Sequence, residues 1–131
     1  MIENLKTKIY QALVDKGYYI TDAANYEEKF PWLLLRLSNM QKMHYLNIEY
    51  SLVDFTIDVF SQYNGEKEIL QLEKDITNTI HKLMQKESSV MGVALKNCRI
   101  IDDKSTGPVA KHGILTYQFI LTIDTEDEED E

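Results

Sequence analysis

The residues of this chain that could carry out acid–base chemistry gather in one short segment, Asp102–His112. The segment holds two carboxylates, two hydroxyl side chains, two lysines and one imidazole. Carboxylate and imidazole groups are common general acids and bases. Adjacent acids beside Gly107-Pro108 are more typical of a solvated turn, however, and the sequence supplies no third group to complete a catalytic constellation. We therefore interpret the segment as a candidate protein interface, formed by Asp102, Asp103, Lys104, Ser105, Thr106, Gly107, Pro108, Lys111 and His112.

The other candidates for chemistry have ordinary structural explanations. His44, His81 and His112 do not have the spacing of metal ligands. Cys98 lies in a predicted strand, where a cysteine is usually a small buried hydrophobic residue. The 5 glycines form no phosphate-binding pattern. We therefore predict that the protein is not an enzyme and has no catalytic residue, bound cofactor or metal ion.

Two segments have the apolar spacing of amphipathic helices. The first is predicted over Ile2–Lys16, with Gly17 as its C-terminal cap. The second is predicted over Glu66–Gln85, and Asn64-Gly65 before it can cap its N-terminus. Each helix presents one apolar stripe, so one face packs on a sheet and the rest is solvated. The stripes consist of Ile2, Leu5, Ile9, Ala12 and Leu13 in the first helix and Ile69, Leu72, Ile76, Ile80 and Leu83 in the second.

Other segments are rich in β-branched and aromatic residues and are predicted to be strands. Their ranges are Trp32–Leu37, Tyr45–Phe60, Leu95–Ile101 and Gly113–Thr125, and a further extended stretch begins at Tyr18–Ile20. The run Trp32–Leu37 is almost continuously apolar, which favours a strand covered on both faces. Within Tyr45–Phe60 the apolar residues change face, which predicts a β-bulge near Leu52-Val53. Ser38–His44 is predicted to be a turn and Asp22–Lys29 an exposed loop.

These elements predict an α+β fold, in which a mainly antiparallel sheet of four to five strands carries two helices on one face. The 131 residues are most economically one domain over 1–125, followed by a disordered acidic tail over 126–131. The tail holds most of the net charge of −8, so the folded body is nearly neutral. A single cysteine fits a reducing compartment, and no signal peptide or membrane-spanning run is recognisable. We therefore expect cytoplasmic synthesis.

A protein that acts through its own assembly is the main interpretation, and two other classes of protein are alternatives to it. One is a small acidic inhibitor or DNA mimic that binds a nucleic-acid enzyme, although a nearly neutral body provides no rigid acidic face. The other is a small enzyme centred on Asp102, Asp103 and His112. Binding to nucleic acid itself is not favoured, because it needs clustered Lys and Arg, whereas Arg36 and Arg99 are isolated in predicted strands.

Five features follow one another along the chain in a recognisable order. They are the opening helix Ile2–Lys16, an apolar strand after Phe30-Pro31, the long strand Tyr45–Phe60, the helix Glu66–Gln85 and a final hairpin ending in Tyr117–Leu121. Together they resemble the tail terminators of long-tailed bacteriophages, a family that includes small tail-to-head joining and tail-completion proteins. Glu126–Glu131 do not belong to that pattern.

The resemblance implies a structural virion protein that forms a hexameric ring on a finished tail tube, stops tube polymerisation and offers a docking face to the head connector. Its implied partners are further copies of itself, the tail tube protein and a head-completion or connector protein. DNA would only pass through the channel, and no membrane is involved. The implied location is the head-proximal end of the tail, reached from the host cytoplasm, where the isolated protein can be a monomer.

A closed ring of identical subunits requires two different complementary surfaces on each subunit. The sequence offers the sheet edges and the long loop predicted over Asp102–His112 as candidates, because long loops suit docking. Asp22–Lys29 and Ser38–His44 are second choices. We expect a protein that lacks Lys104–Ala110 to fold but not to assemble or cap tubes.

Overall fold

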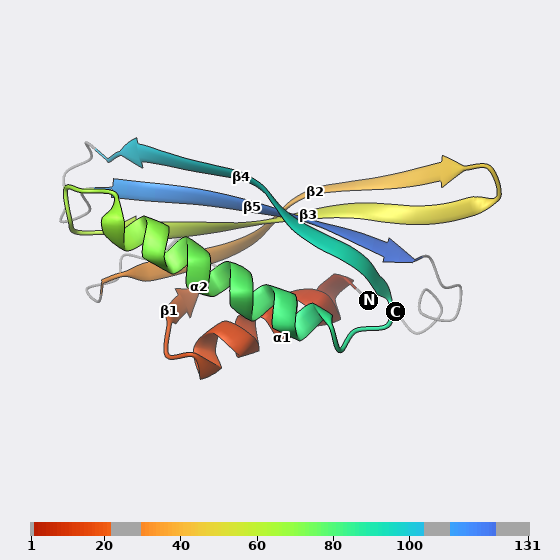
Figure 1. Cartoon of the computed structure of the whole chain (residues 1–131), viewed down its shortest axis with the longest axis horizontal. Helices are drawn as coiled ribbons and strands as arrows, with labels where there is room; N and C mark the ends of the chain where they lie inside the picture. Colours follow the sequence, from red (N-terminus) through yellow and green to blue (C-terminus); the bar gives the residue numbers. More distant parts are fainter. Residues whose placement is uncertain (1, 22–29, 104–110, 123–131) are drawn as a thin grey trace.

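The computed structural model describes residues 2–21, 30–103 and 111–122, which form two helices and five strands (Figure 1). In chain order these are α1 (Ile2–Asp15), β1 (Tyr19–Thr21), β2 (Trp32–Tyr45), β3 (Ile48–Ser61), α2 (Lys67–Met84), β4 (Val90–Asp102) and β5 (Lys111–Thr122). The strands form one mixed, mostly antiparallel sheet in the order β1-β2-β3-β5-β4, in which β1 is parallel to β2. The predicted α+β class and sheet are therefore confirmed. Neither described helix combines the length and the apolarity needed to cross a membrane.

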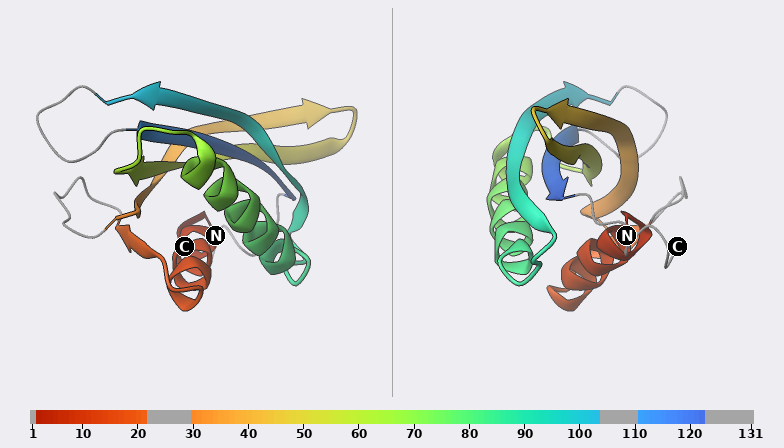
Figure 2. Two further views of the ribbon diagram at one scale, coloured as in Figure 1. Left: turned by 60° about the vertical axis from the view of Figure 1, so that its left-hand side comes forward. Right: turned by 90° about the vertical axis from the view of Figure 1, so that its right-hand side faces the viewer.

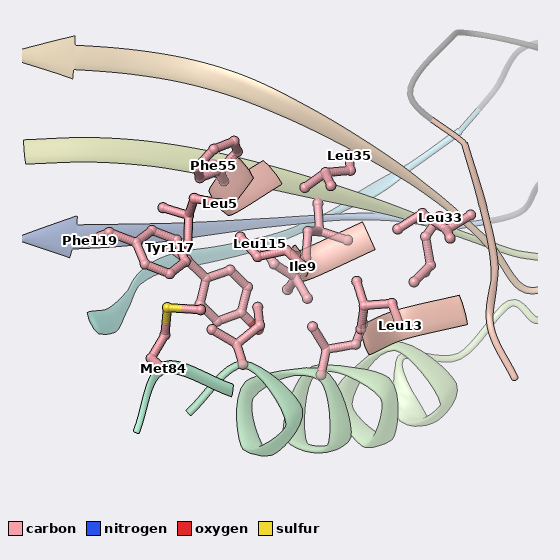
Figure 3. Close-up of a cluster of buried hydrophobic side chains, with 14 of the residues drawn as sticks. Leu5, Ile9, Leu13, Leu33, Leu35, Phe55, Met84, Leu115, Tyr117 and Phe119 are labelled. Carbon is pink, nitrogen blue, oxygen red and sulfur yellow. The ribbon is translucent and has the colours of Figure 1, made fainter. Parts of the chain in front are cut away.

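Both helices lie on the same face of the sheet (Figure 2). Their buried side chains are four or seven residues apart, which places them on one stripe of each helix. They are Leu5, Ile9 and Leu13 in α1, and Ile69, Ile76, Ile80 and Met84 in α2. Alternate residues of β3 and β5 face these stripes, including the fully buried Phe55, Tyr117 and Phe119 (Figure 3). The core thus lies between the helix pair and the sheet. Neither of the two described helices covers the opposite face, which we call the open face.

The first helix ends where the sequence predicts. Gly17 has φ of +93°, a conformation that is readily available only to glycine. The N–H of Gly17 donates to the carbonyl of Val14 at 2.9 Å, and the N–H of Tyr18 to the carbonyl of Leu13 at 3.1 Å, which is the pair of bonds of a Schellman motif. The hydroxyl of Tyr18 donates to Asp75 of α2. Burial, and then the Asp75 carboxylate, raise the pKa of Tyr18, so this link between the helices stays protonated.

The second helix packs closely on the sheet where Ile69 meets Gly113 of β5. A Cβ atom added at Gly113 would lie 2.6 Å from Cγ2 of Ile69 and 3.6 Å from Cβ of Val59, both of which are fully buried. We therefore expect Gly113→Ala to lower the free energy of unfolding by about 1–3 kcal/mol in urea denaturation. Gly92→Ala is the matched control, because its Cβ would meet only Ile120 Cδ1, at 3.8 Å. Equal midpoints for the two variants would contradict this close packing.

The turn predicted over Ser38–His44 is wrong, because these residues continue β2 as far as Tyr45. The chain reverses at Leu46-Asn47. Figure 1 shows that β2 and β3 extend well past the helices, so this part of β2 has no core to face and reads as polar. For the same reason, the prediction that both faces of Trp32–Leu37 are covered holds only for the first residues of this segment. Leu37, the last residue of the segment, is 40% exposed.

The β-bulge predicted near Leu52-Val53 is also wrong. β3 keeps one continuous register with β5, and the register shift lies in the neighbouring β2, between Leu37 and Asn39. The apolar residues change face along β3 because those before Val53 lie outside the core, and Ile48 is 57% exposed. From Val53 onward the odd-numbered residues to Val59 enter the core, whereas Tyr50 is half-buried on the open face.

The remaining predictions differ from the structure mainly at their ends. Both helices match to within one residue, β4 begins at Val90, and β5 begins at Lys111. Asn64-Gly65 do not cap α2, whose N-cap is Glu66 without a capping side-chain hydrogen bond. The predicted loop Asp22–Lys29 and the acidic tail lie outside the described residues.

Candidate assembly surfaces

The structure places three of the predicted interface residues in strands. Asp102 ends β4, and Lys111 and His112 begin β5, so the predicted loop from Asp102 to His112 is too long at both ends. Asp102 and Lys111 are register partners and form an ion pair that joins the two strands. Asp103 follows β4, and Lys104, Ser105, Thr106, Gly107 and Pro108 lie outside the described residues. The interface role of the segment stays a prediction.

The possible acid–base site of the sequence is divided between the two faces of the sheet. Because successive strand residues point to opposite faces, Gly113 faces α2 and its neighbour His112 points to the open face. Asp102 is the register partner of Lys111, the residue before His112. Lys111 and Asp102 therefore both point to the helix side. The ring of His112 stacks on Phe60 at 4.4 Å, and Phe60 stacks on Trp32 at 4.1 Å. His112 is thus held by packing and does not converge with Asp102.

The open face carries a belt of polar side chains that contains two buried carboxylates. Asp58 of β3 is 3% exposed and accepts a hydrogen bond of 2.8 Å from Nε of Arg36. Its other oxygen lies 2.9 Å from Nε2 of His112. Burial alone would raise the pKa of Asp58, but the hydrogen bonds and charges of His112 and Arg36 hold it below its ordinary value. Asp58 is therefore ionised, and it links β2, β3 and β5.

Asp54 repeats this arrangement further along β3. Its carboxylate accepts hydrogen bonds from Nζ of Lys96 at 3.1 Å and from Nε2 of Gln118 at 3.2 Å. Between the two acids, the hydroxyl of Thr56 donates to Oγ of Ser38 at 2.9 Å. Each buried acid thus has one basic partner and one further donor nearby. This balanced polar belt is not the acidic face that a DNA mimic would need.

Two other residues with reactive side chains also have structural partners. Cys98 is partly buried against the core, and burial, followed by the charge of Glu73, raises the pKa of its thiol. Nδ1 of His44 lies 3.2 Å from a carboxylate oxygen of Glu49, at the solvent-exposed end of the β2–β3 hairpin. Within residues 2–21, 30–103 and 111–122, no group of three or more His, Cys, Asp or Glu side chains could hold a metal ion.

The long edges of the sheet are poorly suited to pairing with another strand. Among the described residues β4 pairs only with β5, and β2 beyond Leu34 pairs only with β3. Both edges are interrupted by register shifts, at Met91 and Lys96 in β4 and at Ser38 in β2. Bulges and charged residues are the usual means by which edge strands avoid pairing with other chains. These edges therefore favour association through side chains rather than through a shared sheet.

The described residues expose three large apolar side chains at the turn between β2 and β3, which projects beyond the helices (Figure 1). Leu46 is 86% exposed, Tyr45 67% and Ile48 57%, and we call these three residues the tip. Leu46 also has φ of +56°, which is rare for a branched residue. The tip is not evident from the sequence, because Leu-Asn is not a common hairpin turn. The available signal was Asn47 between two segments of strand-forming residues.

The exposed tip, and the buried acids Asp54 and Asp58 that hold the strands together, favour a structural protein that works through contacts with other proteins. A protein-family model described as tail completion protein gp17 matches residues 5–122, from the first turn of α1 to the end of β5. No curated protein matches the sequence. The chain therefore belongs to the tail completion protein gp17 family.

Membership of this family makes the protein a structural component of the phage tail and not an enzyme. It confirms the resemblance drawn from the order of helices and strands, and it implies contacts with tail and head components.

Proposed function

We propose that this chain ends the tail of a long-tailed phage. A hexameric ring of it caps the finished tube at the head-proximal end, stops the addition of tube subunits and offers the head connector a docking face. The observation that carries the proposal is the position of the contact features. The tip lies at one end of the long axis, and Asp102 and Lys111, the bases of the predicted interface segment, lie at the other (Figure 1).

A closed ring requires two different complementary surfaces on each subunit, and the two ends of this subunit provide different surfaces. In a heterologous contact the surface of one subunit meets a different surface of the next, and successive contacts close if each adds a fixed rotation. A contact between two identical tips would instead stop at a dimer. The bulged edges of the sheet also make a filament joined by strand pairing unfavourable.

The tip provides an energetic reason for assembly. Each of its large apolar side chains gains about 1.5–3 kcal/mol when it is fully buried. One such contact is small beside the entropy lost on association, so an isolated pair is weak. A ring closed on a tube end makes all its contacts together, which explains how the protein can be monomeric until it meets its template.

The nearly neutral body also suits a ring through which DNA passes. Phosphate binding depends on clustered basic residues that release counterions. Arg36 and Lys96, the basic residues of the polar belt, each form an ion pair with a buried Asp. DNA therefore gains little by adhering to this face on its way through the channel.

Replacing Asp103–Ala110 with Asn-Gly tests the contact role of the predicted interface segment. Asp102 and Lys111 are register partners, so a two-residue turn can join them without disturbing the strands. We expect the variant to keep its circular dichroism spectrum and to lose capping when it is mixed with tube protein and viewed by electron microscopy. Deleting Lys104–Ala110 should act in the same way. Normal capping by both variants would remove the role of this segment.

A further inference from the structure

Leu46 is a residue type that its position in the hairpin turn does not favour. It occupies the first position of the two-residue turn, where a positive φ favours glycine or asparagine. Its side chain is nevertheless 86% exposed, so within the subunit it gains almost nothing from being apolar. Strain of this kind in an exposed residue points to a contact made outside the subunit. Tyr45 and Ile48 on either side extend the same apolar surface.

A hollow of about 400 Å³ lies at the opposite end of the molecule, between the end of β3 and the start of α2. It is lined by Tyr63, Gly65, Lys67, Glu68 and Gln71. This volume is in the range of pockets that bind small molecules, and so it is large enough for a bulky side chain.

The hollow and the helix surface beside it combine exposed apolar side chains with one basic and one acidic lining residue, Lys67 and Glu68. Tyr63 is 63% exposed, and Leu70 on the first turns of α2 is 51% exposed. Lys67 is exposed at the hollow, whereas Glu49 follows the tip directly on β3. Both ends therefore expose apolar surface. Glu68 also lines the hollow, but it accepts a hydrogen bond from Ser61. The exposed Lys67 is therefore the charged side chain of the hollow that can meet Glu49, which pairs with His44 in the free subunit.

We propose that the tip of each subunit, with Leu46 foremost, inserts into the hollow at the start of α2 of the next copy of this chain. Figures 1 and 2 place the tip and the start of α2 at opposite ends of the elongated subunit, which is the geometry of a head-to-tail contact. Glu49 then meets Lys67 across the contact. Lys111, the register partner of Ser61, brings the predicted interface segment to the same receiving end.

This inference rests on the proposed ring and specifies how its subunits meet. It is tested by crosslinking on a Cys98→Ala background, which removes the natural thiol. One chain carries Leu46→Cys and another Gln71→Cys, and both are added to tube protein together with a short bis-maleimide. We expect crosslinked dimers only in the mixture of the two chains. A chain carrying both substitutions should give a ladder of products that ends at the closed ring.

Three results would overturn the contact. The first is crosslinking of the Leu46→Cys chain to itself, which indicates tips that meet one another. The second is the presence of rings by electron microscopy without the ladder, which rejects the contact but keeps the proposed function. The third is the absence of rings for the wild-type protein, which rejects both. Pairing Leu46→Cys with Met91→Cys is the matched control, since Met91 is 54% exposed but lies outside the hollow.

Leu46→Gly provides a second test that does not depend on cysteine chemistry. Glycine accepts φ of +56° without strain, so the melting temperature of the subunit should rise or stay unchanged. Loss of the side chain should at the same time raise the protein concentration needed for ring formation at least tenfold. Full assembly by this variant would overturn the role of Leu46.

Discussion

Replacing Tyr45 and Ile48 with Glu is expected to abolish capping of the tail tube while the subunit stays folded. These side chains are 67% and 57% exposed and are register partners, so in the free subunit the two facing glutamates should lower the free energy of unfolding by only about 1 kcal/mol. In an assembled contact, two unpaired carboxylates would replace two apolar anchors. Residues of that kind contribute about 2 kcal/mol or more each, so we expect assembly to need at least a hundredfold more protein.

The measurement is the length distribution of tubes formed with increasing amounts of each variant, viewed by electron microscopy. Met91→Glu is the control, because Met91 is 54% exposed on β4, which β5 separates from the β2–β3 hairpin, and this variant should cap normally. If the double variant limits tube length at the wild-type concentration, the tip has no part in assembly. A fall in its melting temperature of many degrees would instead indicate that the hairpin depends on these residues for folding.

Asp58→Ala is expected to cause the largest loss of stability among single substitutions on the open face. The carboxylate is 3% exposed and joins Arg36 of β2 to His112 of β5. Removing one partner of a buried charged network costs about 3–5 kcal/mol. Because Arg36 is half-exposed and can turn toward water, we expect the lower part of this range. The single tryptophan, Trp32, is buried beside this network, so its fluorescence can follow unfolding in urea.

The effect of this substitution should depend on pH in a defined direction. The pKa of Asp58 in the folded protein lies below its ordinary value of 3.8, so the ionised network stabilises the fold fully above that pH. The stabilisation is lost as pH falls below 3.8 toward the folded pKa, because protons then bind the unfolded state more readily. The difference between wild type and Asp58→Ala should therefore be constant at neutral pH and shrink as the pH falls below 3.8.

The matched control is Glu49→Ala, which removes an exposed pair with His44. Such surface pairs contribute little, so we expect a change below about 0.5 kcal/mol at every pH. If Asp58→Ala is no more harmful than Glu49→Ala, the network does not hold the strands together. Parallel stability curves for wild type and Asp58→Ala as the pH falls below 3.8 would contradict the ionised state of Asp58.

The fold was largely predictable because the core obeys simple spacing. Leu5, Ile9 and Leu13 mark one helix, and the alternation around Tyr117 marks β5 on sequence alone. Gly17 ends α1 because glycine readily adopts the positive φ found there. The order of these elements was also sufficient to predict the family. Such predictions succeed where burial on one face imposes a period on the sequence.

The errors lie where no core imposes a period. Ser38–His44 looked like a turn because β2 leaves the helices there and both its faces meet water. The apolar residues at the tip, by contrast, looked like strand interior and are exposed. A sequence alone does not distinguish an apolar residue exposed on the surface of the subunit from one buried in the core. The structure makes that distinction because it shows how far the hairpin extends beyond α2.

The candidate surfaces were predictable only in part. The segment around Asp102 and Lys111 was identified from its polarity and length, and its bases lie at the end opposite the tip. The link between Asp58 and His112 could not be predicted, since it joins residues far apart in the chain through a shared sheet register. The residues that pair with Asp58 are determined by the strand order β2-β3-β5 and not by any local motif.

The most direct test of the proposed function is electron microscopy of tail tube protein polymerising in the presence of this chain. We predict tubes of limited length, each with one ring of six copies at one end, and no further growth after the ring has bound. Tubes that keep growing, or protein that coats their sides and leaves the ends free, would contradict the account.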